Sequence, residues 1–118
     1  MGWNLSGSSP IFIQIIEHIK LDIIAGYYKP GEKLPSVREF AGLAAVNPNT
    51  MQKSLSELEN TGLIYSNRTS GKFVTEDEEL IAAMKTEIAK QYCDEFITKL
   101  NSIGYSNEEI RKIISELL

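Results

Sequence analysis

The stretch that decides the fold is residues 30–74, PGEKLPSVREFAGLAAVNPNTMQKSLSELENTGLIYSNRTSGKFV. Ser36 followed three positions later by Glu39 is the pattern of a capping box, which predicts a helix beginning just after Pro35. The apolar residues of this helix recur at helical spacing and are expected to face the core: Val37, Phe40, Ala41 and Ala44.

A second helix should begin after Asn47. Asparagine is a preferred N-cap residue, and Pro48 brings the backbone φ of a first helical turn without an N–H that needs a partner. One side of this helix is apolar, with Met51, Leu55 and Leu58, and the other side is polar, with Asn49, Thr50, Gln52, Lys53 and Ser56. Gly62 is expected to end it.

Two short apolar runs follow, at residues 63–65 and 73–74, and the basic segment 67–72 between them predicts the tip of a hairpin. Helix, short turn, helix and hairpin is the order of a winged helix-turn-helix. In that fold the N-terminal part of the second helix reads base edges in the major groove of DNA.

The segment before this stretch should add one more helix. Ser9 and Pro10 repeat the N-cap and first-turn pattern, and Gly26 should stop the helix at about Ala25. Its apolar stripe contains Phe12, Ile15, Ile16, Ile19 and Ile23. The short segment at residues 34–35 is placed to pair with the hairpin as a third small strand.

After the hairpin, two more helices are expected. Thr75 with Glu78 predicts a capping box for a long helix to about Ser102, and Ser106 with Glu109 predicts one for a short last helix. The long helix carries a stripe made of Met84, Ile88, Tyr92, Phe96 and Leu100, and the short one carries Ile110, Ile113, Ile114 and Leu117. The expected fold is thus mainly α with a small β-hairpin.

The two tail helices show more apolar side chains than one covering surface needs, and they are too short to enclose a core or a roomy ligand cavity. They either pack back on the winged domain or pair with a second copy of the chain. We favour a two-fold dimer interface. The expected organisation is a DNA-binding domain at residues 1–75 and a dimerisation region at 76–118.

The charge is unevenly distributed. Residues 1–75 carry seven Lys or Arg against six Asp or Glu, which gives +1, whereas residues 76–118 carry five against ten, which gives −5. The acid therefore lies in the tail, and the first part is close to neutral. So few positive charges predict modest DNA affinity for one copy of the chain. A DNA-binding protein of this kind gains most affinity when two copies bind two half-sites.

The sequence lacks the residue patterns that enzymes, metal sites and nucleotide-binding loops need. His18 has no ligand or catalytic partner at suitable spacing, Cys93 is the only cysteine, and the SGK of residues 70–72 lacks the rest of a P-loop. We therefore expect no enzyme, metal or cofactor, and the residues identify no small-molecule effector. The sequence has no apolar run of about 20 residues and no signal-peptide pattern, so the expected location is the cytoplasm, without membrane contact.

Two segments resemble one known family. Residues 10–41, PIFIQIIEHIKLDIIAGYYKPGEKLPSVREFA, and residues 46–74, VNPNTMQKSLSELENTGLIYSNRTSGKFV, resemble the GntR family of bacterial transcriptional regulators and, more narrowly, its YtrA-type members. The short two-helix tail is also similar to the YtrA type, which lacks the large effector-binding domain of other branches. The resemblance implies a homodimeric repressor that binds an inverted-repeat operator, often beside genes for an ABC transporter.

The resemblance also implies DNA contacts. Arg38 matches an arginine that contacts DNA near the second helix of the fold, and Gln52 stands where other branches have a DNA-contacting arginine. In the hairpin Gly71 is retained, while Thr69 stands at a usual glycine position. The full expected set of DNA-binding residues is Arg38, Asn47, Asn49, Thr50, Gln52, Lys53, Arg68, Gly71 and Lys72.

A winged-helix module that binds protein instead of DNA is the alternative interpretation. Such a module should expose an apolar or acidic face over residues 47–56, and this sequence shows neither. Polar residues at the start of the second helix beside a basic hairpin tip favour double-stranded DNA as the partner.

Overall fold

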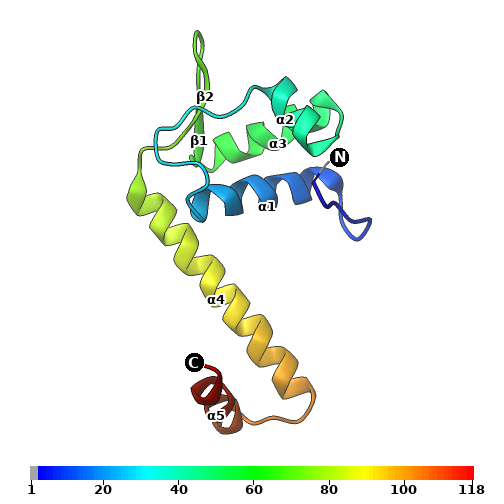
Figure 1. Cartoon of the computed structure of the whole chain (residues 1–118), viewed down its shortest axis with the longest axis vertical. Helices are drawn as coiled ribbons and strands as arrows, with labels where there is room; N and C mark the ends of the chain where they lie inside the picture. The colour runs from blue at the N-terminus through cyan, green and yellow to red at the C-terminus, as the bar shows by residue number, and fades with distance from the viewer. Residues whose placement is uncertain (1–2) are drawn as a thin grey trace. The chain divides into compact units, whose positions relative to one another are not determined.

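The computed structural model describes residues 3–118, so Met1 and Gly2 of the expected domain at residues 1–75 lie outside the described residues. These described residues fold into five helices and one antiparallel hairpin in the order that the sequence predicts (Figure 1). The elements are α1 (Ile11–Ile24), α2 (Val37–Ala44), α3 (Pro48–Asn60), β1 (Ile64–Asn67), β2 (Gly71–Val74), α4 (Glu78–Ser102) and α5 (Asn107–Leu117). The expected fold class, mainly helical with a small hairpin, is confirmed.

Helix α1 begins one residue later than the Ser9–Pro10 pattern predicts. Pro10 occupies the N-cap position and no side chain caps the helix there, so the prediction of a Ser9 cap is wrong. Gln14 holds the preceding segment instead, because its Nε2 donates to the carbonyl oxygens of Ser6 (2.7 Å) and Ser9 (2.8 Å). The inner residues of α1 are Ile15, Ile19 and Ile23.

The capping predictions for α2 and α3 are confirmed. Ser36 Oγ accepts a hydrogen bond from the Glu39 N–H (3.1 Å), and Glu39 Oε1 accepts one from the Ser36 N–H (2.9 Å). Asn47 Oδ1 accepts from the Asn49 N–H (2.8 Å), with Pro48 as the first residue of α3. The buried residues of these helices are Phe40, Ala41, Ala44, Met51, Ser54, Leu55 and Leu58, whereas Val37 is only half-buried.

The hairpin is longer and its tip is shorter than the sequence suggests. The strands pair from Ile64 opposite Val74 to Asn67 opposite Gly71, which leaves residues 68–70 as the turn. The prediction of a tip over residues 67–72 is therefore too wide, because Gly71 and Lys72 belong to β2. The third extended segment forms an isolated bridge, Lys33 with Phe73, and not a full strand.

Helix α3 lies at the centre of the first part of the chain, where it packs against α1, α2 and β1 (Figure 1). Close approach to α1 is possible because Ser54, buried on α3, has a small side chain whose Oγ lies 3.2 Å from the Phe12 carbonyl oxygen. An aromatic group closes the core beside α2: Trp3 and Tyr28 both meet the Phe40 ring edge-on, at centroid distances of 6.1 and 6.0 Å.

His18 packs against the segment that precedes α1. Its ring stacks on that of Trp3 at a centroid distance of 3.8 Å, and its Nε2 lies 3.3 Å from Asp22 Oδ2. Within residues 3–118 no group of three or more metal-ligating side chains comes together. No helix of this described part is long and apolar enough to cross a membrane.

The cap of α4 differs from the prediction. Thr75 Oγ1 accepts from the Asp77 N–H (3.1 Å), and Asp77 Oδ1 accepts from the Leu80 N–H (3.1 Å), so Asp77 and not Thr75 caps the helix. Asp77 is the cap because its carboxylate lies directly before the first helical residue, next to the free N–H groups of the first turn. The predicted box of Thr75 with Glu78 is wrong.

The last helix has the capping box that the sequence predicts. Ser106 Oγ accepts from the Glu109 N–H (3.2 Å), and Glu109 Oε1 accepts from the Ser106 N–H (3.0 Å). These bonds hold the Glu109 carboxylate in its charged form and lower the pKa of this side chain. Cys93, the single cysteine, is exposed on α4.

The chain divides into two compact units, one ending at Ala82 and the other formed by Ala83–Leu118. Helix α4 begins in the first unit and continues into the second. In the second unit Ile88 and Ile110 are buried within the chain. Large apolar side chains remain exposed there: Tyr92, Phe96, Ile103, Tyr105, Ile114, Leu117 and Leu118.

Candidate nucleic-acid interface

The first turn of α3 presents polar side chains to solvent. The carbonyl oxygen of the Asn47 side chain is occupied by its capping bond, whereas Asn49 is exposed and its side chain has no hydrogen bond to any described residue. Thr50 is half-buried. An amide with a free donor and a free acceptor is the group that recognises adenine in the major groove, so Asn49 is the best placed of the three for reading a base.

The exposed face of α3 continues with Gln52, Lys53 and Ser56. Gln52 Nε2 donates to Ser56 Oγ (3.2 Å), which orients this amide along the helix. Lys53 Nζ lies 4.0 Å from the centre of the Phe12 ring, a cation–π contact that fixes the ammonium group beside α1. Both residues lie on the expected face, but each already has a partner in the chain.

Arg38 occupies the second position of α2 and is exposed. Its neighbours Ser36 and Glu39 are bonded to each other in the capping box, and these bonds lower the pKa of Glu39. Within residues 3–118 the guanidinium has no ion pair. Among the described residues it is therefore an unpaired cation on the surface of the first helix of the helix-turn-helix.

The hairpin turn is built by Asn67. Its Oδ1 accepts from both the N–H (3.1 Å) and the hydroxyl (3.0 Å) of Thr69, which makes a tight turn with Arg68 exposed at its end. Gly71 has a backbone φ of +110°, a conformation that residues with a Cβ rarely adopt. This requirement explains why glycine stands at position 71.

Lys72 is not at the tip, and its charge is already paired. Its Nζ lies 2.5 Å from Glu59 Oε1 and 2.9 Å from Ser66 Oγ, and its side chain is 14% exposed. Partial burial alone would raise the pKa of Glu59, but the hydrogen bonds from Lys72 and Ser66 outweigh it and leave this pKa below its usual value. Glu59 is therefore charged at neutral pH and neutralises Lys72.

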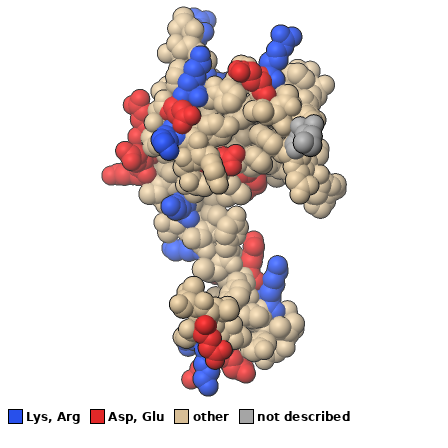
Figure 2. All heavy atoms as spheres, viewed as in Figure 1, with Lys and Arg blue, Asp and Glu red and all other residues tan. Residues whose placement is uncertain are grey.

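Figure 2 shows Lys and Arg side chains at the end of the hairpin and along the same edge of the first unit, with Asp and Glu side chains between them. The sequence alone did not indicate the roles of Glu59 and Asn67 in supporting the hairpin. For Glu59 the available signal was an acid near the end of one predicted helix and a lysine in the hairpin that follows it.

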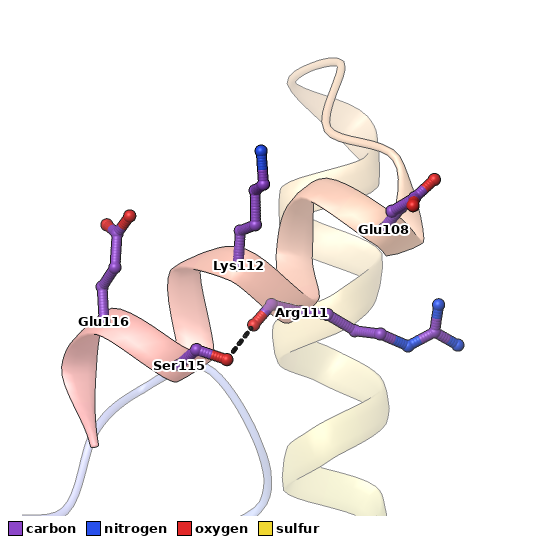
Figure 3. A pocket seen from close by; sticks show the side chains of 5 residues that line it. All are labelled: Glu108, Arg111, Lys112, Ser115 and Glu116. Carbon is purple, nitrogen blue, oxygen red and sulfur yellow. Dashed lines mark hydrogen bonds between the residues drawn. The ribbon is translucent and has the colours of Figure 1, made fainter.

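Two hollows lie on the second unit. One of about 480 Å³ runs along α5, where Lys112 and Glu116 project to the same side and Arg111 projects to another (Figure 3). A smaller hollow of about 150 Å³ is lined by Ile97, Asn107, Ile110, Arg111 and Ile114. The first is open to solvent because all of its lining residues are exposed.

The comparison with protein families matches the first unit. Residues 13–74 fit the family described as bacterial regulatory proteins, gntR family. The chain belongs to the GntR family. This GntR match covers the stretch from α1 to the end of β2. It therefore contains every residue of the expected DNA-binding set.

Individual GntR relatives extend the similarity to the tail. The HTH-type transcriptional repressor YtrA of Bacillus subtilis is 35% identical over 111 residues, which cover 93% of this chain and 85% of that protein. A GntR family transcriptional regulator from Listeria monocytogenes is 39% identical with a TM-score of 0.87, over 95% of this chain and 98% of that one.

The DNA-binding domain of AraR has been solved in complex with operator ORX1. It is 30% identical with a TM-score of 0.56, over 64% of this chain and 92% of that one. These GntR proteins are transcriptional regulators and not enzymes. The chain is accordingly a GntR-type transcription regulator with a winged helix-turn-helix DNA-binding domain.

Proposed function

We propose that the chain is a homodimeric, sequence-specific DNA-binding repressor that recognises an inverted-repeat operator. The observation that carries the proposal is the exposed polar start of α3, where the Asn49 side chain has no partner among the described residues. It is joined by Arg68, exposed at the hairpin tip and without an ion pair within residues 3–118. The AraR domain, of similar fold, is bound to an operator in its structure.

The dimer is supported by the second unit. Tyr92 and Phe96 are 54% and 38% exposed on α4, and Ile114 and Leu117 are exposed on α5. Several large apolar side chains exposed on one small unit are a feature that often marks an interface. Ile88 and Ile110 are already buried in one chain, so they support the packing of each copy and the exposed residues of the predicted set supply the contact.

Repression and the regulated genes are proposed from similarity. The relative YtrA is named a repressor, and the resemblance to the YtrA type extends the proposal to control of an ABC transporter operon. The match to YtrA covers 93% of this chain, and the second unit of the chain contains α5 and most of α4. We propose the cytoplasm as the location.

Selection of bound sites from a pool of random DNA tests the function directly. We expect an inverted repeat whose half-sites are separated by about 10 base pairs or a multiple of this, the spacing that a two-fold dimer requires. Recovery of no common sequence, with binding that is equally weak on every DNA, would favour the alternative of a protein-binding winged helix.

Asn49→Ala should lower the affinity for the selected site by about 1–3 kcal/mol and leave the affinity for random DNA unchanged, because a base contact carries the discrimination. Fluorescence anisotropy on both DNAs measures the two values. Asn60→Ala, at the opposite end of α3, is the matched control and should change neither. An equal loss on both DNAs would mean that Asn49 positions the helix and does not read a base.

Arg38→Ala should weaken binding to every DNA and reduce the slope of log affinity against log salt by about 0.9, the value for one lost phosphate contact. The fold should be preserved, since Arg38 is exposed and the capping box lies in Ser36 and Glu39. Titrations at four salt concentrations measure the slope, with Lys20→Ala on α1 as the control for loss of one charge. A slope equal to that of the wild type would show that Arg38 does not contact a DNA phosphate.

A further inference from the structure

Glu59, Ser66 and Lys72 form a polar cluster contributed by three elements. Glu59 lies in the last turn of α3, Ser66 in β1 and Lys72 in β2, where Ser66 and Lys72 stand directly opposite each other in the ladder. The Ser66 hydroxyl donates to Glu59 Oε1, and Lys72 Nζ is in contact with both groups. The cluster therefore ties both strands of the hairpin to the end of α3.

The backbone of Lys72 is held from its other edge. The Leu34 N–H donates to the Lys72 carbonyl oxygen (2.8 Å), and Lys33 bridges to Phe73 next to it. Lys72 is thus fixed by its side chain to α3 and by its main chain to the segment before α2. An ammonium group held in this way is not available to a phosphate unless the cluster opens.

The hairpin tip lacks anchors of this kind. Arg68, Thr69 and Ser70 are exposed, and the hydrogen bonds of the turn are made within residues 67–70. A two-stranded hairpin is only marginally stable by itself, so the direction in which Arg68 projects depends on what holds the strands. In this part of the chain the cluster is a polar side-chain link between the strands and α3, in addition to the apolar packing of β1 on α3.

We propose that Glu59 is a positioning residue that holds the hairpin against α3 by binding Lys72, so that Arg68 and not Lys72 supplies the cation of the hairpin to DNA. This inference rests on the proposed function for its DNA part. It assigns Lys72, which the sequence places in the DNA-binding set, to the internal support of the hairpin. It also adds Glu59, which contacts no DNA in this scheme, to the residues that determine recognition.

Hydrogen exchange of the full-length protein without DNA tests the internal link. Lys72→Met keeps the aliphatic stem and Glu59→Gln keeps the shape, so each removes one charge. Each variant should raise the exchange rates of the hairpin amides about tenfold, and the double variant should be no faster than either one, because both remove the same interaction. The amides of α1 serve as the internal control and should be unchanged.

Charge reversal provides a second test of the link between Glu59 and Lys72. Glu59→Lys or Lys72→Glu alone should accelerate hairpin exchange, and the two together should bring it back toward the wild-type rate. Wild-type exchange in Glu59→Gln and Lys72→Met, or additive effects in the double variant, would overturn the inference.

The salt dependence of DNA binding tests the assignment of the cation. Lys72→Met should leave the slope of log affinity against log salt unchanged, whereas Arg68→Met should lower it by about 0.9. A decrease of about 0.9 in Lys72→Met would place Lys72 at a phosphate and overturn the inference. If the wild-type chain binds no DNA selectively, the proposed function fails, and the exchange experiment still decides whether Glu59 holds the hairpin.

Discussion

Replacing Tyr92 and Phe96 with glutamate should convert the full-length protein to a monomer and lower its affinity for a two-half-site operator by about 10²–10⁴-fold. The two side chains are four residues apart on α4 and both are exposed, so the substitutions place two negative charges in the proposed interface without disturbing the chain's own core. Affinity falls because the second half-site is no longer bound by a linked partner.

Sedimentation velocity at micromolar concentration measures the assembly, and anisotropy measures the affinity for one and for two half-sites. Lys90→Glu is the matched control, because it changes the net charge by the same −2 from the opposite side of α4. The control should remain dimeric. A wild-type chain that sediments as a monomer would contradict the proposed dimer. A double variant that stays dimeric would show that the interface lies elsewhere on the chain.

Phe40→Ala should lower the free energy of unfolding of the first unit by about 3–5 kcal/mol, a large fraction of the stability of a domain of this size. Phe40 is 1% exposed, and its ring is met edge-on by both Trp3 and Tyr28. Truncation to alanine leaves a cavity between α2 and the segment before α1, and it removes these aromatic contacts.

Urea unfolding followed by the fluorescence of Trp3 measures this loss, since Trp3 is the only tryptophan and lies in the first unit. Leu43→Ala on the same helix is the control, because Leu43 is 53% exposed and its loss should stay within about 0.5 kcal/mol. Equal effects of the two substitutions would show that Phe40 is not a core residue of α2.

Much of the fold could be predicted from the sequence because its signals are local. The capping boxes that begin at Ser36 and Ser106 involve residues three positions apart, and the Asn47–Pro48 start needs only two neighbours. Local signals fail where two candidates compete. Thr75 and Asp77 are both good N-caps, and only the geometry of the turn shows that Asp77 is the one bonded to the helix.

The candidate site was less predictable because its decisive contacts join distant residues. Glu59 and Lys72 are 13 positions apart and meet only after the hairpin folds back on α3. Lys53 meets Phe12 across the packing of α3 on α1, which no periodicity describes. The sequence therefore located the basic hairpin correctly. It could not separate Arg68, which has no ion pair in the described part of the chain, from Lys72, which is paired with Glu59.

The lone exposed Cys93 has a practical consequence for studying this protein. Because the chain contains no other cysteine, a maleimide dye will attach at one known position on α4 without any change to the sequence. Chains labelled separately with a donor and an acceptor dye and then mixed would report association by energy transfer. Exchange of copies between assemblies, with and without operator DNA, then becomes a rate that can be followed in real time.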